Sequence, residues 1–162
     1  MGEHIVALRG WHPALAQAEV RALFPNRVMR TFASSRLMQF QLNEEDIPNI
    51  SISSGIEAIF KNGENHPFTD IESIRLIIKS HLDLHPPNEQ PCAVLAWKHG
   101  RGIEGVSRSE FAGRIGGLLS AMDAKIDLEH PKQRFGILFD ELSSSVTFGW
   151  LQGTGPKGDE SV

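Results

Sequence analysis

The first 24 residues pair a short apolar run with a longer amphipathic stretch. Residues 4–10 are mostly apolar and end at a glycine, which predicts a buried strand. Pro13 follows, and proline is tolerated in the first turn of a helix. The spacing predicts a helix that ends before Pro25-Asn26, with an apolar face listed as Leu15, Ala18, Val20, Ala22 and Leu23.

Three more strands are predicted before residue 64. Residues 27–32 and 37–42 are strand-like, and in the second of them Met38, Phe40 and Leu42 alternate with glutamines. Residues 56–60 form an apolar run that meets Asn62-Gly63, a pair typical of turns. The polar residues 63–67 therefore predict a boundary between two domains.

The second half opens with a helical pattern over residues 70–82, which Pro86-Pro87 ends. A buried-type strand is predicted over 93–97. Ser107 and Glu110 have the spacing of a capping box, which predicts a helix running to about Met122. Three strands are predicted after it, over residues 125–128, 135–139 and 146–151.

The predicted order is strand, helix, three strands, then helix, strand, helix, three strands. This order predicts an α+β protein in which helices pack on mixed β-sheets. We expect an N-terminal domain over residues 1–63, a second domain over 64–153, and a flexible tail or linker over 154–162, where glycine, proline and polar residues dominate.

Composition narrows the class of protein. The chain has 162 residues and is 40% hydrophobic, which is enough to bury a core. It has no apolar run near the roughly 20 residues of a membrane span, and no signal-peptide pattern at the N-terminus. One cysteine, Cys92, excludes an internal disulfide, and its apolar neighbours predict a small buried side chain. We expect a cytoplasmic protein with no membrane contact.

Charge is unevenly distributed along the chain. The net charge is −4, yet residues 97–134 carry seven basic against five acidic side chains, and residues 1–40 carry five Arg against two Glu. A basic face can therefore form locally, and basic side chains are what binding to phosphates requires.

The sequence contains no recognisable catalytic pattern. It has neither a phosphate-binding P-loop nor a nucleophile elbow, and the glycines at 100, 102 and 105 do not have dinucleotide-binding spacing. His81 and His85 lie one helical turn apart and could bind a metal. The alternative is that both are solvated histidines near a helix C-terminus, and we expect this one, with no metal, cofactor or catalytic residue.

The candidate binding residues are basic. Lys98, His99 and Arg101 lie in or beside a glycine-rich loop, where backbone can approach a ligand closely. Arg108 lies in the first turn of the next helix, whose free N–H groups attract phosphate, and Arg114 lies further along it. Lys132 and Arg134 follow the corner at Pro131.

Two alternatives stay open for this region. The basic side chains can be ordinary surface charges paired with Glu104, Glu110 and Glu129. Trp97 can stack on a base, or it can be a buried residue at the end of a strand.

Five segments follow one another in the second half: AVLAWK (93–98), the basic loop, SRSEFAGRIGGLL (107–119), KIDLEHP (125–131) and FGILF (135–139). In this order they resemble the THUMP domain of RNA-modification enzymes. That domain shows a strand ending in a basic residue, a helix rich in small residues, and a D-L-x-x-P corner before a final strand pair. Asp127, Leu128 and Pro131 match the corner, and Phe148-Gly149 resembles the last strand.

The N-terminal segment VALRGWHPALAQAEVRAL (6–23) is similar to the entry segment of the tRNA guanosine-10 N2-methyltransferase family. The resemblance implies an N-terminal ferredoxin-like domain followed by a THUMP domain, which together grip tRNA, with the THUMP domain engaging the 3′-CCA end. The methyltransferase motifs of that family, an Asn/Asp-Pro-Pro-Tyr and a glycine-rich cofactor loop, do not occur here.

We therefore expect a non-catalytic tRNA-binding module that positions tRNA for methylation by a separate or missing catalytic domain. Its implied partners are tRNA and a methyltransferase subunit. The alternative is a protein–protein docking module without RNA contact.

Overall fold

The computed structural model describes residues 2–10, 12–23, 29–43, 45 and 55–152. Contacts divide the chain into two compact units. The first unit is Met1–Glu64 with Leu151–Val162, and the second unit is Asn65–Trp150. The bounds of independently folding domains, expected at residues 63 and 153, stay a prediction.

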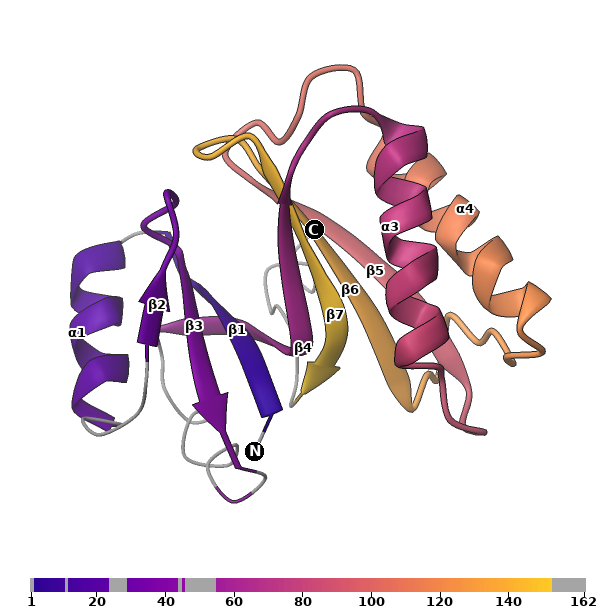
Figure 1. Ribbon diagram of the computed structural model, residues 1–162, viewed down its shortest axis with the longest axis horizontal. Helices are drawn as coiled ribbons and strands as arrows, with labels where there is room; N and C mark the ends of the chain where they lie inside the picture. The colour runs from indigo at the N-terminus through magenta and orange to yellow at the C-terminus, as the bar shows by residue number, and fades with distance from the viewer. Residues whose placement is uncertain (1, 11, 24–28, 44, 46–54, 153–162) are drawn as a thin grey trace. The chain divides into compact units, whose positions relative to one another are not determined.

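The first unit is a sheet with one helix. Its elements are β1 (Gly2–Leu8), α1 (Pro13–Leu23), β2 (Met29–Thr31), β3 (Leu37–Leu42) and β4 (Ile56–Pro67), most of which lies in this unit (Figure 1). The strand order is β2-β3-β1-β4, and each pair of neighbours is antiparallel. This is the arrangement of a ferredoxin-like unit.

The core of the first unit corrects the predicted face of α1. Ala16 and Val20 are buried against residues of β1, β3 and β4, whereas Leu15 is 61% exposed and Leu23 is 41% exposed. Alanines at four positions of α1 make several faces nearly equally apolar. The sequence pattern therefore did not single out the face that packs.

A second correction concerns β4. The predicted turn at Asn62-Gly63 does not end this strand, which continues to Pro67. Asn62 has φ +51, so the turn-prone pair is accommodated as an irregularity within the strand. A Cβ on Gly63 would lie 3.0 Å from Ile5 Cγ1, so a side chain here would require its neighbours to shift. The residues predicted as a boundary belong to this strand, and the two compact units divide within it, between Glu64 and Asn65.

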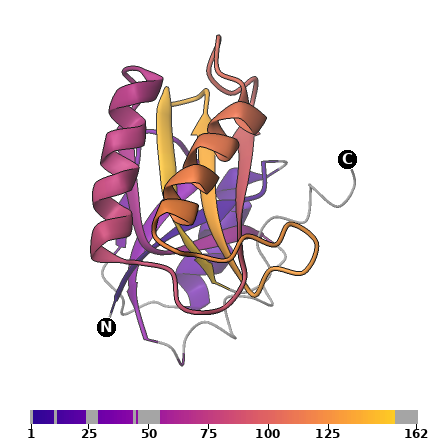
Figure 2. The same cartoon turned by 90° about the vertical axis from the view of Figure 1, so that its right-hand side faces the viewer.

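The second unit places two helices on one face of a mixed sheet. Its elements are α3 (Ile71–Leu84), β5 (Cys92–His99), α4 (Arg108–Ala121), β6 (Gln133–Asp140) and β7 (Ser145–Gln152), which ends just beyond the unit. The strand order is β4-β7-β6-β5, with β5 parallel to β6 and β6 antiparallel to β7. Figure 2 shows α3 and α4 side by side over the sheet.

The core of this unit lies between the helices and the sheet. Its buried side chains come from both helices and three strands: Ile74, Ile78, Leu82, Cys92, Phe111, Ile115, Leu119, Phe135, Ile137, Phe139, Val146 and Phe148. The buried position predicted for Cys92 is confirmed, and burial raises the pKa of its thiol. Apolar residues three or four apart on the helices, and two apart on the strands, lie on one face of each element, and these faces pack together.

Both helices begin at a capping side chain. Asp70 accepts a hydrogen bond from Ser73 N at 2.8 Å, and Ser107 Oγ accepts one from Glu110 N at 3.3 Å. These contacts satisfy amide groups that have no partner inside the helix. No helix in the described part of the chain is long and apolar enough to cross a membrane.

The strand predicted over residues 125–128 is wrong. Only an isolated bridge between Cys92 and Ile126 remains there. Asp127 Oδ1 instead accepts hydrogen bonds from Glu129 N at 3.0 Å and His130 N at 3.1 Å, which closes the D-L-x-x-P segment into a tight corner. Local side-chain bonding competes here with strand formation.

Candidate nucleic-acid interface

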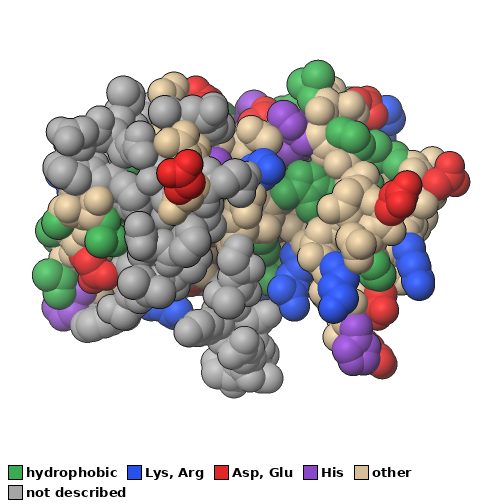
Figure 3. Space-filling view, turned by 90° about the horizontal axis from the view of Figure 1, so that it is seen from below, with side chains coloured by type: hydrophobic (Ala, Val, Ile, Leu, Met, Phe, Trp, Pro, Cys, Tyr) green, Lys and Arg blue, Asp and Glu red, His purple; other side chains and the backbone are tan. Residues whose placement is uncertain are grey.

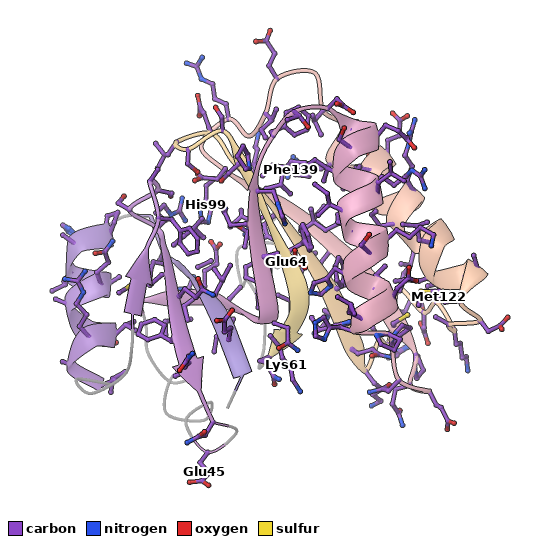
Figure 4. The ribbon with its side chains drawn as sticks, viewed as in Figure 1. Glu45, Lys61, Glu64, His99, Met122 and Phe139 are labelled. Carbon is purple, nitrogen blue, oxygen red and sulfur yellow. The ribbon has the colours of Figure 1, made fainter. Side chains whose placement is uncertain are left out.

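The open edge of the second unit's sheet is β5, and its end presents the first candidate residue. Lys98 pairs with Phe139 of β6, so its side chain lies on the face that the helices cover. His99 is the next residue and therefore lies on the opposite face. Figure 4 labels His99 and Phe139 on these two sides of the sheet.

The glycine-rich loop after β5 turns sharply around Arg101. Gly100 and Gly102 have φ values of +70 and +73, and Gly102 N donates to His99 O at 3.3 Å. The backbone N–H of Arg101 donates to the Glu141 carboxylate. The loop is thus held at both its start and its turn, while the Arg101 side chain is exposed.

A pocket of about 590 Å³ lies between the edge of β5, this loop and the first turns of α4. Arg108 and Ala112 reach it from α4, one helical turn apart. The lining separates into an apolar part and a polar part. The apolar part is Val94, Leu95, Ala96, Ile103, Val106, Ala112 and Phe139, with Gly102; the polar part is Lys98, Arg101, Ser107, Arg108 and Ser109.

The three cations of this pocket have no acidic partner in the part of the chain that is described. Lys98, Arg101 and Arg108 are exposed, and their side chains form no ion pair there. The backbone N–H groups of Arg108 and Ser109, at the start of α4, also donate to no described group. The pocket therefore offers positive charge and open donors together.

Arg114 differs from these three residues. Its guanidinium lies 3.6 Å from Glu110 and 3.8 Å from Glu72, so it links α4 to α3. The hydrogen bond from Arg75, together with the charges of Arg75 and Arg114, lowers the pKa of Glu72. Arg114 therefore agrees with the alternative interpretation, in which a basic side chain forms ordinary ion pairs at the surface.

The remaining candidates lie elsewhere. His99 is buried, with 1% of its surface exposed, and Trp97 is buried on the same face. Arg134 pairs with Ala93, five residues before Lys98, so about 17 Å of strand separates them. Alternation also places Arg134 on the sheet face opposite to Lys98. The predicted basic set is thus divided between two ends of the sheet.

Sequence reasoning missed the apolar part of the pocket. Val94 and Ala96 are two residues apart on β5, and Ala112 follows Arg108 by four residues on α4. The sequence did contain a signal for it: small side chains that recur at strand spacing on β5 and at helix spacing on α4, close to cations, can line a pocket. Which of them face each other depends on how α4 packs against β5.

His81 of α3 lies at the edge of the core, and His85 is the residue that follows the end of this helix. His81 is 1% exposed, and its ring lies 5.3 Å from that of Phe148 and 4.8 Å from that of His85. The expectation that both are solvated is therefore wrong for His81. Among the described residues, no group of three or more His, Cys, Asp or Glu side chains could hold a metal ion.

Comparison with known proteins identifies the fold. No protein-family model matches the chain, and no curated protein sequence matches it. Solved structures do match: PH1313 from Pyrococcus horikoshii Ot3, with a TM-score of 0.60, 16% identity and 99% of this chain covered; and TrmN from Thermus thermophilus, with a TM-score of 0.66, 16% identity and 95% covered.

A third match is a 4-thiouridine synthetase in complex with RNA and ATP, with a TM-score of 0.56, 14% identity and 96% of this chain covered. The chain spans 59%, 46% and 42% of these three proteins, respectively. At such identities the likeness concerns the fold. The chain is an α+β protein with the fold predicted from its sequence, a ferredoxin-like unit followed by a THUMP-type unit.

Proposed function

We propose that this protein is a non-catalytic RNA-binding module that holds the unpaired 3′-CCA end of tRNA and positions the tRNA for methylation by a separate catalytic domain. The observation that carries the proposal is the pocket beside β5, with three cations and no acidic partner for them among the described residues. The residues proposed to hold RNA there are Lys98, Arg101 and Arg108.

The cations suit phosphate groups. Guanidinium groups such as those of Arg101 and Arg108 bind phosphate oxygens through paired N–H donors, and Lys98 adds a point charge. The open N–H groups at the start of α4 provide further donors of the kind that bind phosphate. Together these groups can neutralise a few phosphates of one strand.

The apolar part of the pocket supports an unpaired nucleotide over a duplex. Val94, Ala96 and Ala112 are small, so they leave space beside the cations for a flat base. Bases in a duplex are stacked and paired, whereas unpaired bases can be splayed out and bound individually. A single-stranded end meets both requirements of the pocket, phosphate and base.

The structural neighbours support a role in RNA modification. One neighbour was solved in complex with RNA, and that protein is a 4-thiouridine synthetase. The chain corresponds to less than half of that protein, which is consistent with a binding part that serves a catalytic part.

The test is a fluorescence anisotropy titration with intact tRNA and with the same tRNA lacking its 3′-CCA. We expect intact tRNA to bind more tightly. Arg101→Gln with Arg108→Gln should reduce affinity several-fold and make the dependence of log K on log salt less steep by about two, one for each lost phosphate contact.

Lys79→Glu is the matched control. Lys79 lies on α3, is half exposed and pairs with Asp83, and the change lowers the net charge by the same amount as the double variant. Equal binding of trimmed and intact tRNA would contradict recognition of the end. A stable protein partner without any RNA binding would instead favour the docking module.

A further inference from the structure

We infer a second RNA-contacting surface in the second unit, which binds the phosphate backbone of a helical stem. It consists of Lys125, Lys132 and Arg134, here called the corner patch. The inference rests on the proposed function but concerns residues near the start of β5, whereas Lys98 and Arg101 of the pocket lie at and beyond its end.

The corner patch is assembled around the start of β5. Cys92 N donates to Lys125 O at 2.8 Å, and Lys132 N donates to Pro91 O at 2.8 Å. Arg134 pairs with Ala93 in the parallel ladder. The backbone of each of these three cations thus contacts one of the consecutive residues 91–93. This brings together two segments of the chain that are separate in sequence.

Figure 3 looks onto the end of the molecule at which β6 begins. It shows Lys and Arg side chains gathered on the second unit, with a His side chain beside them. Lys125, Lys132 and Arg134 are all exposed, and none of them forms an ion pair within the described ranges. They are available to a large anionic partner.

The backbone that carries the patch is held rigidly. The Gln133 side chain donates to Gln90 O at 2.8 Å and to Asn88 O at 3.1 Å, and it accepts from Asn88 N at 3.2 Å. Gln133 lies between Lys132 and Arg134, so these bonds fix the segment from which both cations project. A preorganised surface loses less conformational entropy when it binds.

Two acidic side chains of the corner, Asp127 and Glu129, form no ion pair with the patch among the described residues. The amides of His130 and Glu129 donate to the carboxylate of Asp127 and hold its pKa below the ordinary value. Asp127 thus holds the corner, and its negative charge partly offsets that of Lys125, so Lys132 and Arg134 are the main cations of the patch. Glu129 is exposed and forms no ion pair with the three cations in the part of the chain described here.

Position determines which part of an RNA the patch can reach. Lys98 of the pocket and Arg134 lie about 17 Å apart along β5 and β6, and their side chains lie on opposite faces of the sheet. A phosphate held by Lys98 cannot also contact Arg134. Exposed cations suit the phosphate backbone of a duplex, which proteins recognise by shape and by phosphate contacts. The geometry therefore assigns the unpaired end to the pocket and the adjoining stem to the patch.

Two RNAs separate these roles: a single-stranded oligonucleotide ending in CCA, and a hairpin whose stem carries the same unpaired end. Affinities are measured at several salt concentrations for the unmodified protein, for Lys132→Gln with Arg134→Gln, for Arg101→Gln with Arg108→Gln, and for Lys79→Glu. Circular dichroism spectra of all four proteins verify the fold.

We expect the hairpin to bind more tightly than the oligonucleotide. The Lys132 and Arg134 variant should lose this advantage, with a salt dependence for the hairpin that is less steep by about two, while its affinity for the oligonucleotide stays unchanged. The pocket variant should weaken binding of both RNAs. Adding Lys125→Gln should reduce hairpin affinity further.

Unchanged hairpin binding by the patch variant would overturn the inference and leave the proposed function standing. Equal weakening of both RNAs by the patch variant would also overturn it, since the patch would then contact the single strand. If the unmodified protein binds neither RNA, the proposed function fails, and this inference fails with it.

Discussion

Gly100 is the position at which the loop of the pocket depends most directly on backbone conformation. It has φ +70, and an added Cβ would overlap the Glu141 carboxylate that accepts the hydrogen bond from Arg101 N. Gly100→Ala should therefore destabilise the protein and displace Arg101. Gly105 is the matched control, because it has φ +79 but nothing within 4 Å of an added Cβ.

The expected magnitude follows from three terms. A left-handed conformation costs a residue with a Cβ about 1–2 kcal/mol, and restriction of the unfolded chain by alanine offsets about 0.4–1 kcal/mol of this. Gly105→Ala should thus lower the free energy of unfolding by at most about 1.6 kcal/mol. Gly100→Ala also loses the Arg101 amide bond to Glu141, which adds about 1 kcal/mol.

The assay is urea-induced unfolding followed by tryptophan fluorescence, since Trp97 and Trp150 belong to the second unit. The free energies of unfolding are compared between variants whose dependence on urea concentration, the m-value, is the same. Gly100→Ala should also weaken binding of the CCA oligonucleotide more than Gly105→Ala does. If the two variants lose equal stability, the carboxylate does not hold the loop, and the reasoning is refuted.

Three further predictions concern the second unit. Gly113→Ala should raise the free energy of unfolding by about 0.5–1 kcal/mol, because Gly113 is inside α4 with open space around it, and an unchanged or lower value would contradict this. Phe148→Ala should lower that free energy by about 3–5 kcal/mol, because the ring is fully buried and lies 5.6 Å from His66 and 6.1 Å from Phe135; a loss below about 1 kcal/mol would show that the site repacks. The backbone amides of Glu129 and His130 should be protected from hydrogen exchange, relative to the unfolded chain, above pH 3.8. This protection should decrease as the pH falls through the lowered pKa of Asp127, because protonation removes the charged acceptor. Asp127→Asn keeps an acceptor oxygen and should abolish this pH dependence.

Local signals in the sequence were sufficient for most elements. The Ser107 cap, the helix after it and the buried strands of the second unit depend on residues close together in the chain, and the structure contains them. Two local predictions were wrong for a shared reason. Asn62-Gly63 is a turn signal that strand pairing overrode in β4, and residues 125–128 are a strand signal that the Asp127 corner overrode.

The sequence by itself determined the α+β class, the order of the elements and which residues carry positive charge in the second half. Only the tertiary structure decided how that charge is divided. The parallel pairing of β5 with β6 joins residues about 40 apart in the chain and places Lys98 beside Phe139 but Arg134 beside Ala93. This register is set by the packing of the whole core, and a shift of one residue would exchange the two faces of a strand. No local pattern encodes it, so a sequence that predicted one basic face folds with the cations of the pocket near the end of β5 and the corner patch near its start.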